Sequence, residues 1–182
     1  MKTSLFIVLI VCSHVAMSQK CMFTRQGMDS FSGEKINSIT HTNSGWTWSS
    51  VKKGDKYFIE MTFLHAGELK ISMTKKDSML IKLENGEVLT LFPAREVLPA
   101  PATIGNDTDP DNIGPAIRRT VTSYSPAFEV SKQVFETLSK SPLLAIRFSF
   151  TELPFDFDFT RRPLKRSTNN IIRQATCILA VD

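Results

Sequence analysis

The sequence has few residues of the kinds used in catalysis and none of the short motifs that usually mark a reaction centre. It contains three histidines, three cysteines and eight glycines. It has no HExxH, CxxC or GxSxG pattern and no glycine-rich phosphate loop. The chemistries that depend on those motifs are therefore not predicted, and we expect no cofactor.

Long apolar runs are also missing. The longest, Leu5 to Cys12, is too short to span a bilayer. It follows the positive charge of Lys2 and precedes Ala16-Met17-Ser18, whose small residues are typical of a cleavage site. The pattern predicts a signal peptide over residues 1–18 and a secreted or periplasmic protein without a transmembrane segment after cleavage.

The charge balance is mild once the leader is removed. Loss of Lys2 leaves 21 basic against 18 acidic residues, a net charge of +3. A surplus this small does not predict nucleic-acid binding. About 160 residues remain, enough for one domain with its own core. We expect residues 19–182 to form a single β-rich domain.

Two cysteines remain after cleavage, Cys21 and Cys177, at opposite ends of the chain. In an oxidising compartment such a pair is a candidate disulfide, and two unpaired thiols are the alternative. The apolar stripe of a helix predicted from Pro163 to Leu179 leaves Cys177 outside it, which favours an accessible thiol.

The stretch from Ser131 to Thr160 has the clearest periodicity. An apolar residue at every fourth position predicts a helix that Ser131 can cap and Pro142 ends. Strict alternation then predicts a strand, a turn at Glu152-Leu153-Pro154 and a second strand. The second strand places three aromatic side chains on one face, which need a core to enter: Phe155, Phe157 and Phe159.

Other strands follow from alternation and turn residues. Asn85-Gly86 favours a type I′ turn that pairs Leu83 with Val88. Five of the nine prolines fall between residues 93 and 115, which predicts a long loop. Further strands are expected at residues 36–40, 46–48, 57–64, 68–74 and 117–124. The fold class is α+β or mainly β: an antiparallel sheet or small sandwich of about eight strands, with a short internal helix and a C-terminal helix.

Trp46 and Trp48 lie on the same face of their predicted strand and are the candidate binding residues. If exposed, they form an aromatic platform for a sugar or a peptide. If buried, they are an ordinary part of the core, and the large area of each ring favours burial.

Alternating carboxylates at Asp107, Asp109 and Asp111 resemble part of a calcium loop. An EF-hand starting at Asp107 would need glycine at Asn112 and glutamate at Arg118, so a solvated acidic loop is the simpler interpretation. No metal site is predicted.

Two further groups of residues have both a catalytic and a structural interpretation. His41 and His65 are the histidines left after cleavage, and they are polar surface or core residues unless the fold brings them to a nucleophile. Asp156 and Asp158 share a strand face, as a pair able to do acid and base chemistry would. Surface ion pairs with nearby arginines explain that pair equally well.

A resemblance to a known group of proteins rests on four features: the leader ending before Gln19, the segment Leu83 to Leu91, the segment Val130 to Phe150, and the closing Ala175-Thr176-Cys177-Ile178-Leu179. Together they resemble small secreted proteins of Bacteroidota that have no assigned activity. The resemblance implies a β-rich exported domain and no particular residue role.

The first functional hypothesis is an exported, non-enzymatic binding or structural domain whose partner is a glycan, a peptide or an envelope protein. It would act through a sheet face or through the 93–115 loop. A small hydrolase built from scattered residues near His41 and His65 is the alternative. A carrier of an apolar ligand is a third possibility, which requires a cavity among the phenylalanines.

Overall fold

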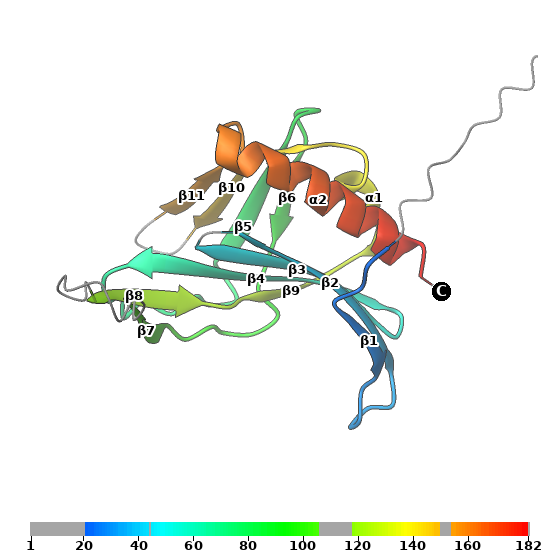
Figure 1. The fold of residues 1–182 in the computed structure, drawn as a ribbon, viewed down its shortest axis with the longest axis horizontal. Coiled ribbons are helices and arrows are strands. Elements are labelled where there is room, and N and C mark those ends of the chain that lie inside the picture. The colour runs from blue at the N-terminus through cyan, green and yellow to red at the C-terminus, as the bar shows by residue number, and fades with distance from the viewer. Residues whose placement is uncertain (1–20, 44, 106–117, 150–153, 182) are drawn as a thin grey trace, which may run out of the picture.

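A computed structural model describes residues 21–43, 45–105, 118–149 and 154–181 (Figure 1). The leader, the three aspartates at 107, 109 and 111, and the turn at Glu152-Leu153 lie outside these ranges. The described elements are, in order, β1 (Arg25–Met28), β2 (Lys35–Asn43), β3 (Trp46–Lys53), β4 (Lys56–Ala66), β5 (Ser78–Leu83), β6 (Val88–Leu91), β7 (Ala100–Gly105), β8 (Arg118–Tyr124), β9 (Ala127–Val130), α1 (Lys132–Leu138), β10 (Leu143–Ser149), β11 (Pro154–Asp158) and α2 (Arg162–Leu179).

The strands form two antiparallel sheets, which confirms the predicted fold class. A seven-stranded sheet has the order β1-β2-β3-β4-β8-β7, with β9 also paired to β4. A four-stranded sheet has the order β11-β10-β5-β6. The two sheets lie in separate layers, and α2 runs along one side of the molecule and packs on β2 and β3 (Figure 1). In the described part of the chain, no helix is long and apolar enough to cross a membrane.

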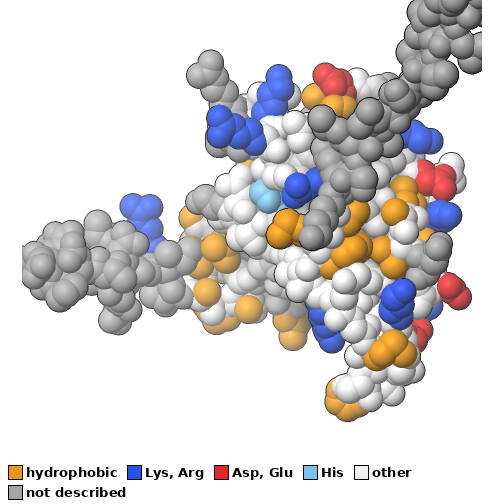
Figure 2. Space-filling model, turned by 45° about the vertical axis from the view of Figure 1, so that its right-hand side comes forward, with side chains coloured by type: hydrophobic (Ala, Val, Ile, Leu, Met, Phe, Trp, Pro, Cys, Tyr) orange, Lys and Arg blue, Asp and Glu red, His pale blue; other side chains and the backbone are white. Residues whose placement is uncertain are grey.

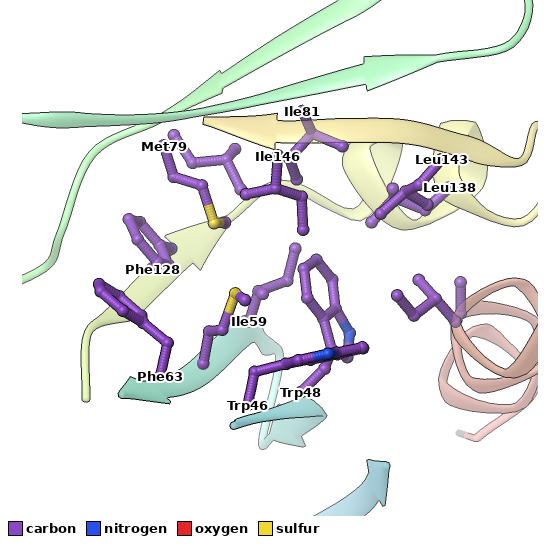
Figure 3. Packing of buried hydrophobic residues seen from close by; sticks show 14 of the residues in the cluster. Trp46, Trp48, Ile59, Phe63, Met79, Ile81, Phe128, Leu138, Leu143 and Ile146 are labelled. Atoms are coloured by element: carbon purple, nitrogen blue, oxygen red, sulfur yellow. The ribbon is translucent and has the colours of Figure 1, made fainter. Parts of the chain in front are cut away.

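Alternation along β2, β3 and β4 produces the core between the sheets. Trp48 and Met61 are register partners and both are buried, while the residues adjacent to each in sequence point to the other side of the sheet. Figure 3 shows Trp46, Trp48 and Phe63 from this sheet facing Met79, Ile81 and Ile146 from the other. The apolar set is therefore buried between the two layers.

The hairpin at Asn85-Gly86 has a register different from the predicted one. Lys82 pairs with Val88, and Ile81 with Leu89, one residue away from the pairing that a two-residue turn requires. Gly86 has a φ of 88°, whereas no described residue other than glycine has a positive φ. Asn85 therefore does not take the conformation that a type I′ turn needs, and the longer loop with glycine at its left-handed position shifts the register by one.

Two other predictions about the chain path were wrong. Residues 68–74 were expected to form a strand but make only an isolated bridge, between Met73 and Val97. Side chains hold this segment in place: Thr122 accepts from the Leu69 amide at 2.8 Å, and Tyr124 donates to the Ile71 carbonyl at 2.7 Å. The expected 93–115 loop contains β7, which is paired along its whole length with β8.

The stretch around α1 and β10 confirms the predicted helix and strand, with one local difference. Ser131 is the N-cap residue of α1, although its side chain makes no capping hydrogen bond. The pairing of β10 with β5 shifts between Leu143 and Ala145, so Leu144 is an extra, bulged residue. Because of this bulge, Leu143 and Ile146 are both buried although their spacing breaks strict alternation.

Helix α2 is buried on a face that the apolar stripe only partly predicted. The buried side includes Ser167, Gln174 and Cys177 as well as Ile171 and Ala175. Cys177 was expected to be accessible, but it is buried and forms a disulfide with Cys21, with a Cα–Cα distance of 5.7 Å. The segment before β1 is thereby joined to this side of the helix, so the buried arc is wider than the apolar residues alone indicate.

Candidate binding face

The residues first considered for binding, Trp46 and Trp48, are core residues. Both indoles are buried. The Trp46 ring meets Phe159 edge-on at 5.6 Å between centroids, and the Trp48 Nε1 donates to the Ser50 hydroxyl at 3.1 Å. An exposed aromatic platform at these positions is therefore excluded, and the burial alternative is confirmed.

Four phenylalanines, Phe63, Phe148, Phe155 and Phe157, pack against one another, which leaves the apolar-ligand carrier without support at this cluster. Phe63 stacks on Phe148 with ring centroids 4.4 Å apart and on Phe155 at 5.2 Å. Phe157 meets Phe63 edge-on at 6.1 Å. Of the three phenylalanines predicted for the second strand, Phe159 is fully buried and the other two are half-buried.

The two histidines lie on the same face of the seven-stranded sheet but contact different elements. His41 is the register partner of Trp48, whereas His65 lies beyond Phe63 on β4 and contacts the ring of Phe155 at 5.7 Å. Strand spacing and rise separate the two histidines by about 10 Å across the sheet and about 13 Å along it. They do not form one site.

His41 meets helix α2 through polar side chains. Its Nε2 lies 3.1 Å from the Ser167 hydroxyl, and the Asn43 amide donates to the same hydroxyl at 3.2 Å. The Asn170 amide lies 3.5 Å from the His41 Nδ1. Burial, and secondly the charge of Arg173, lower the pKa of His41, so its imidazole is neutral near pH 7. A neutral histidine beside a serine is the beginning of a nucleophilic pair, but Ser167 is only 2% exposed.

The carboxylates of β11 form surface ion pairs. Asp156 is bound by Arg147 at 2.7 Å, and Asp158 lies 3.3 Å from Arg161 and accepts from the Thr160 amide at 2.9 Å. The hydrogen bond from Arg147 is the main reason that the pKa of Asp156 is lowered. Both aspartates are therefore charged at neutral pH and paired with neighbours, as the structural interpretation predicted. In the described ranges, no group of three histidine, cysteine or acidic side chains is placed to hold a metal ion.

The outer face of the seven-stranded sheet, the side turned away from the other sheet, contains a second apolar surface. Ile36 and Val51 lie on this face because their register partners alternate with core residues. They are only 7% and 8% exposed, yet neither belongs to the core between the sheets. Together with Phe58 they form the floor of a shallow groove of about 280 Å³, which we call the outer groove.

Charged side chains stand at the edges of the outer groove. Arg25 on β1 lines one end, and Glu60 on β4 lines the other, with Lys53 beside them. Lys53 is bound by Asp29 at 2.8 Å and by Glu34 at 3.6 Å. Neither Arg25 nor Glu60 forms an ion pair with any residue that the structure describes.

The β1–β2 hairpin projects from the sheet beside the outer groove (Figure 1) and carries exposed apolar side chains near its tip (Figure 2). Phe31 at the turn is fully exposed, and Met28 at the end of β1 is 67% exposed. Large apolar side chains gathered at an exposed tip in this way are typical of a contact surface.

The turn that presents Phe31 is held in one conformation. The Asp29 carboxylate accepts from the amides of Phe31 and Ser32 at 2.9 and 3.1 Å, and its backbone carbonyl accepts from the Gly33 amide at 2.8 Å. The hydrogen bond from Lys53 is the largest of several interactions that hold the pKa of Asp29 far below its usual range. Phe31 is thus presented on a preorganised turn, which lowers the entropy lost on binding.

No protein-family model, curated protein or solved structure matches this chain. The sequence pattern did not point to the outer groove, because its three apolar residues come from three different strands. The available signal was odd spacing, since Ile36 lies three residues before Ile39 and Val51 lies three residues after Trp48. Two apolar residues at such a spacing on one strand must point to opposite faces.

Proposed function

We propose that this protein is an exported, non-enzymatic binding domain that holds a polypeptide partner through the outer groove and the tip of the β1–β2 hairpin. The observation that carries the proposal is the pair of exposed apolar side chains, Phe31 and Met28, on the hairpin beside the outer groove, whose lining includes Ile36 and Val51 on a sheet face outside the core between the sheets. Ile36 and Val51 are already covered by their neighbours, so the apolar area open to a partner comes from the exposed hairpin side chains and from the half-buried Phe58. Exposed apolar side chains gathered in this way mark a contact surface.

The size of the outer groove favours a polypeptide over a small ligand. Its volume of about 280 Å³ is at the lower limit of small-molecule sites, which enclose about 300–1,000 Å³. A space of this size takes one or two side chains of a partner. Burial of Trp46 and Trp48 removes the stacking surface expected for a sugar or a peptide, so neither kind of partner binds at these two residues.

Two features support export to the periplasm or the cell surface. The leader pattern of residues 1–18 is one, and the disulfide between Cys21 and Cys177 is the other, since such bonds persist mainly in oxidising compartments. We propose action at the cell envelope or in the secreted medium on these grounds.

Site-specific photocrosslinking tests the binding function. Benzoylphenylalanine in place of Phe31, in the cells that produce the protein, should give a covalent adduct with a partner. The same probe in place of Lys82, an exposed residue of the other sheet, should not. Val51→Thr keeps the side-chain shape but adds a hydroxyl to the groove floor, so it should reduce the adduct at position 31 several-fold.

Thr47→Val is the matched control, because it makes the reverse exchange on the same strand face outside the groove. Equal adduct from positions 31 and 82, or an adduct that Val51→Thr leaves unchanged, would show that the outer groove is not the binding surface.

A small hydrolase is the second candidate, because His41 lies 3.1 Å from the Ser167 hydroxyl. If this pair were a reaction centre, purified protein would hydrolyse p-nitrophenyl acetate and butyrate. Ser167→Ala, and alanine at both His41 and His65, would each abolish the reaction. The binding function predicts no serine-dependent turnover, since the Ser167 side chain is almost completely covered.

A further inference from the structure

We infer that the polypeptide held by the outer groove is a second copy of this chain, in a two-fold symmetric dimer that pairs the outer faces of two seven-stranded sheets. The inference rests on the proposed function and names the partner of the same site. It is carried by the charges of the groove, by the exposed Phe31, and by the positions of both on one side of the molecule.

The first argument is that the charges at the groove ends complement each other. Arg25 and Glu60 both line the groove, from β1 and β4, and neither has an ion-pair partner in the described chain. Strands β2 and β3 separate them. A surface with opposite unpaired charges at its two ends is complementary in charge to a second copy of itself that is rotated by 180°.

A two-fold axis that lies in the interface, between β2 and β3 and along them, produces this match. It places β1 of one copy over β4 of the other, and β2 over β3. The register places Arg25 level with Phe58, so Arg25 of each copy then lies two residues, or about 7 Å, along β4 from Glu60 of the other copy. The long arginine side chain can reach that carboxylate, and the contact occurs twice. Because the interface is isologous, no other surface of the chain is needed.

The second argument is that a projection and a hollow lie on the same side of the molecule. The hairpin that carries Phe31 borders the outer groove and projects from the sheet (Figure 1). Under the same axis, the hairpin tip of one copy lies beside the β3–β4 turn of the other copy, past the start of β4. Phe58 forms the apolar floor of the groove at that end of β4. Contact with that turn would cover part of Phe31 and Met28 without any change of fold.

The size of the outer sheet face determines the affinity expected for the dimer. Four strands spaced about 4.8 Å apart, with the four residues of β1 and about seven of each of the other three, give a face of roughly 400 Å² in projection before the hairpin is added. Stable complexes bury about 800 Å² per partner. The dimer should therefore be reversible, with a dissociation constant on the order of 10–100 μM.

Sedimentation equilibrium of the mature, disulfide-bonded protein is the test. The wild-type chain should show a monomer–dimer equilibrium in this concentration range. Arg25→Glu and Glu60→Arg should each weaken the dimer roughly tenfold or more, since each puts like charges together at two symmetric contacts. Lys82→Glu makes a comparable charge change on the other sheet and should have no effect.

Mixing the two single variants gives the sharpest result. In a mixed dimer, the glutamate introduced at position 25 of one chain faces the arginine introduced at position 60 of the other, and the two unchanged residues also form a pair. The mixture should therefore form a heterodimer, and the double variant Arg25→Glu/Glu60→Arg should regain self-association. Recovery by charge exchange cannot result from misfolding, because misfolded variants do not rescue each other.

A wild-type chain that is monomeric up to about 500 μM, or single variants that dimerise as well as wild type, would overturn the inference. The photocrosslink at position 31 separates this failure from failure of the proposed function. An adduct of twice the chain mass indicates a second copy. A groove-dependent adduct of any other mass would refute the dimer and leave the binding function supported.

Discussion

Replacing both Cys21 and Cys177 by alanine should lower the free energy of unfolding by about 3–5 kcal/mol. The disulfide joins residues 156 positions apart, so it closes a loop that contains nearly all of the described chain. In the chain-entropy model, a loop of this size restrains the unfolded chain by about 5 kcal/mol at 25 °C, from which native strain is subtracted. The same bond fixes the segment before β1 to α2.

Urea unfolding followed by tryptophan fluorescence would measure the effect, because Trp46 and Trp48 are buried in the native state. With a slope of about 2 kcal/mol/M, the midpoint should fall by about 2 M. Wild-type protein unfolded in reductant should match the double variant. This control separates loss of the cross-link from any cavity left by the smaller side chains.

A loss below about 1 kcal/mol, with an unchanged slope, would refute the reasoning. It would mean that the unfolded chain is already restrained without the bond. A difference between reduced wild type and the double variant would instead locate the effect in native packing around Cys177.

Three further outcomes are expected. Phe63→Ala should cost about 3–5 kcal/mol in urea unfolding because Phe63 is fully buried and stacked on three rings, whereas Phe31→Ala should change stability by less than about 0.5 kcal/mol. Equal effects would contradict the assigned core. Gly86→Ala should cost about 1 kcal/mol, because the φ of 88° strains a side chain even though nothing lies within 4 Å of an added Cβ. Gly86→Asn should cost less, because asparagine adopts positive φ more readily than alanine. Urea midpoints that rank the two variants the other way would contradict this. Because the pKa of His41 is lowered in the folded protein, its contribution to the free energy of unfolding should be complete above about pH 6.5. This contribution should be lost as the pH drops, because the unfolded chain takes up the proton first. His41→Gln should flatten this part of the pH profile, and an unchanged slope between about pH 7.5 and 5.5 would show that His41 is not its source.

The local sequence pattern was enough to predict the helices and strands that are buried on one face only. The alternation of Tyr57 to Leu64 predicted β4, and the four-residue spacing after Ser131 predicted α1. Residues 68–74 show why the same rule fails elsewhere. They alternate as well, but side chains of β8 satisfy their backbone groups, so no strand partner is needed.

The outer groove could not be predicted from the sequence pattern, for a different reason. Odd spacing places Ile36 and Val51 on the face opposite the core residues of their strands, but these two and Phe58 form one surface only because the register of three strands aligns them. Likewise, Asp29 becomes a rigid turn anchor only when Lys53, at the end of β3, reaches it. Neither relation has a fixed sequence spacing.

Composition and periodicity determined, from the sequence by itself, that this chain is β-rich, that it ends in an amphipathic helix, and that two cysteines were available to pair. These properties depend on near neighbours or on counts. Tertiary structure alone decided which apolar residues became core and which became outer surface, that Cys177 met Cys21, and that His41 met Ser167. Those outcomes depend on strand register and on how α2 packs, and both are set by contacts between residues far apart in the chain.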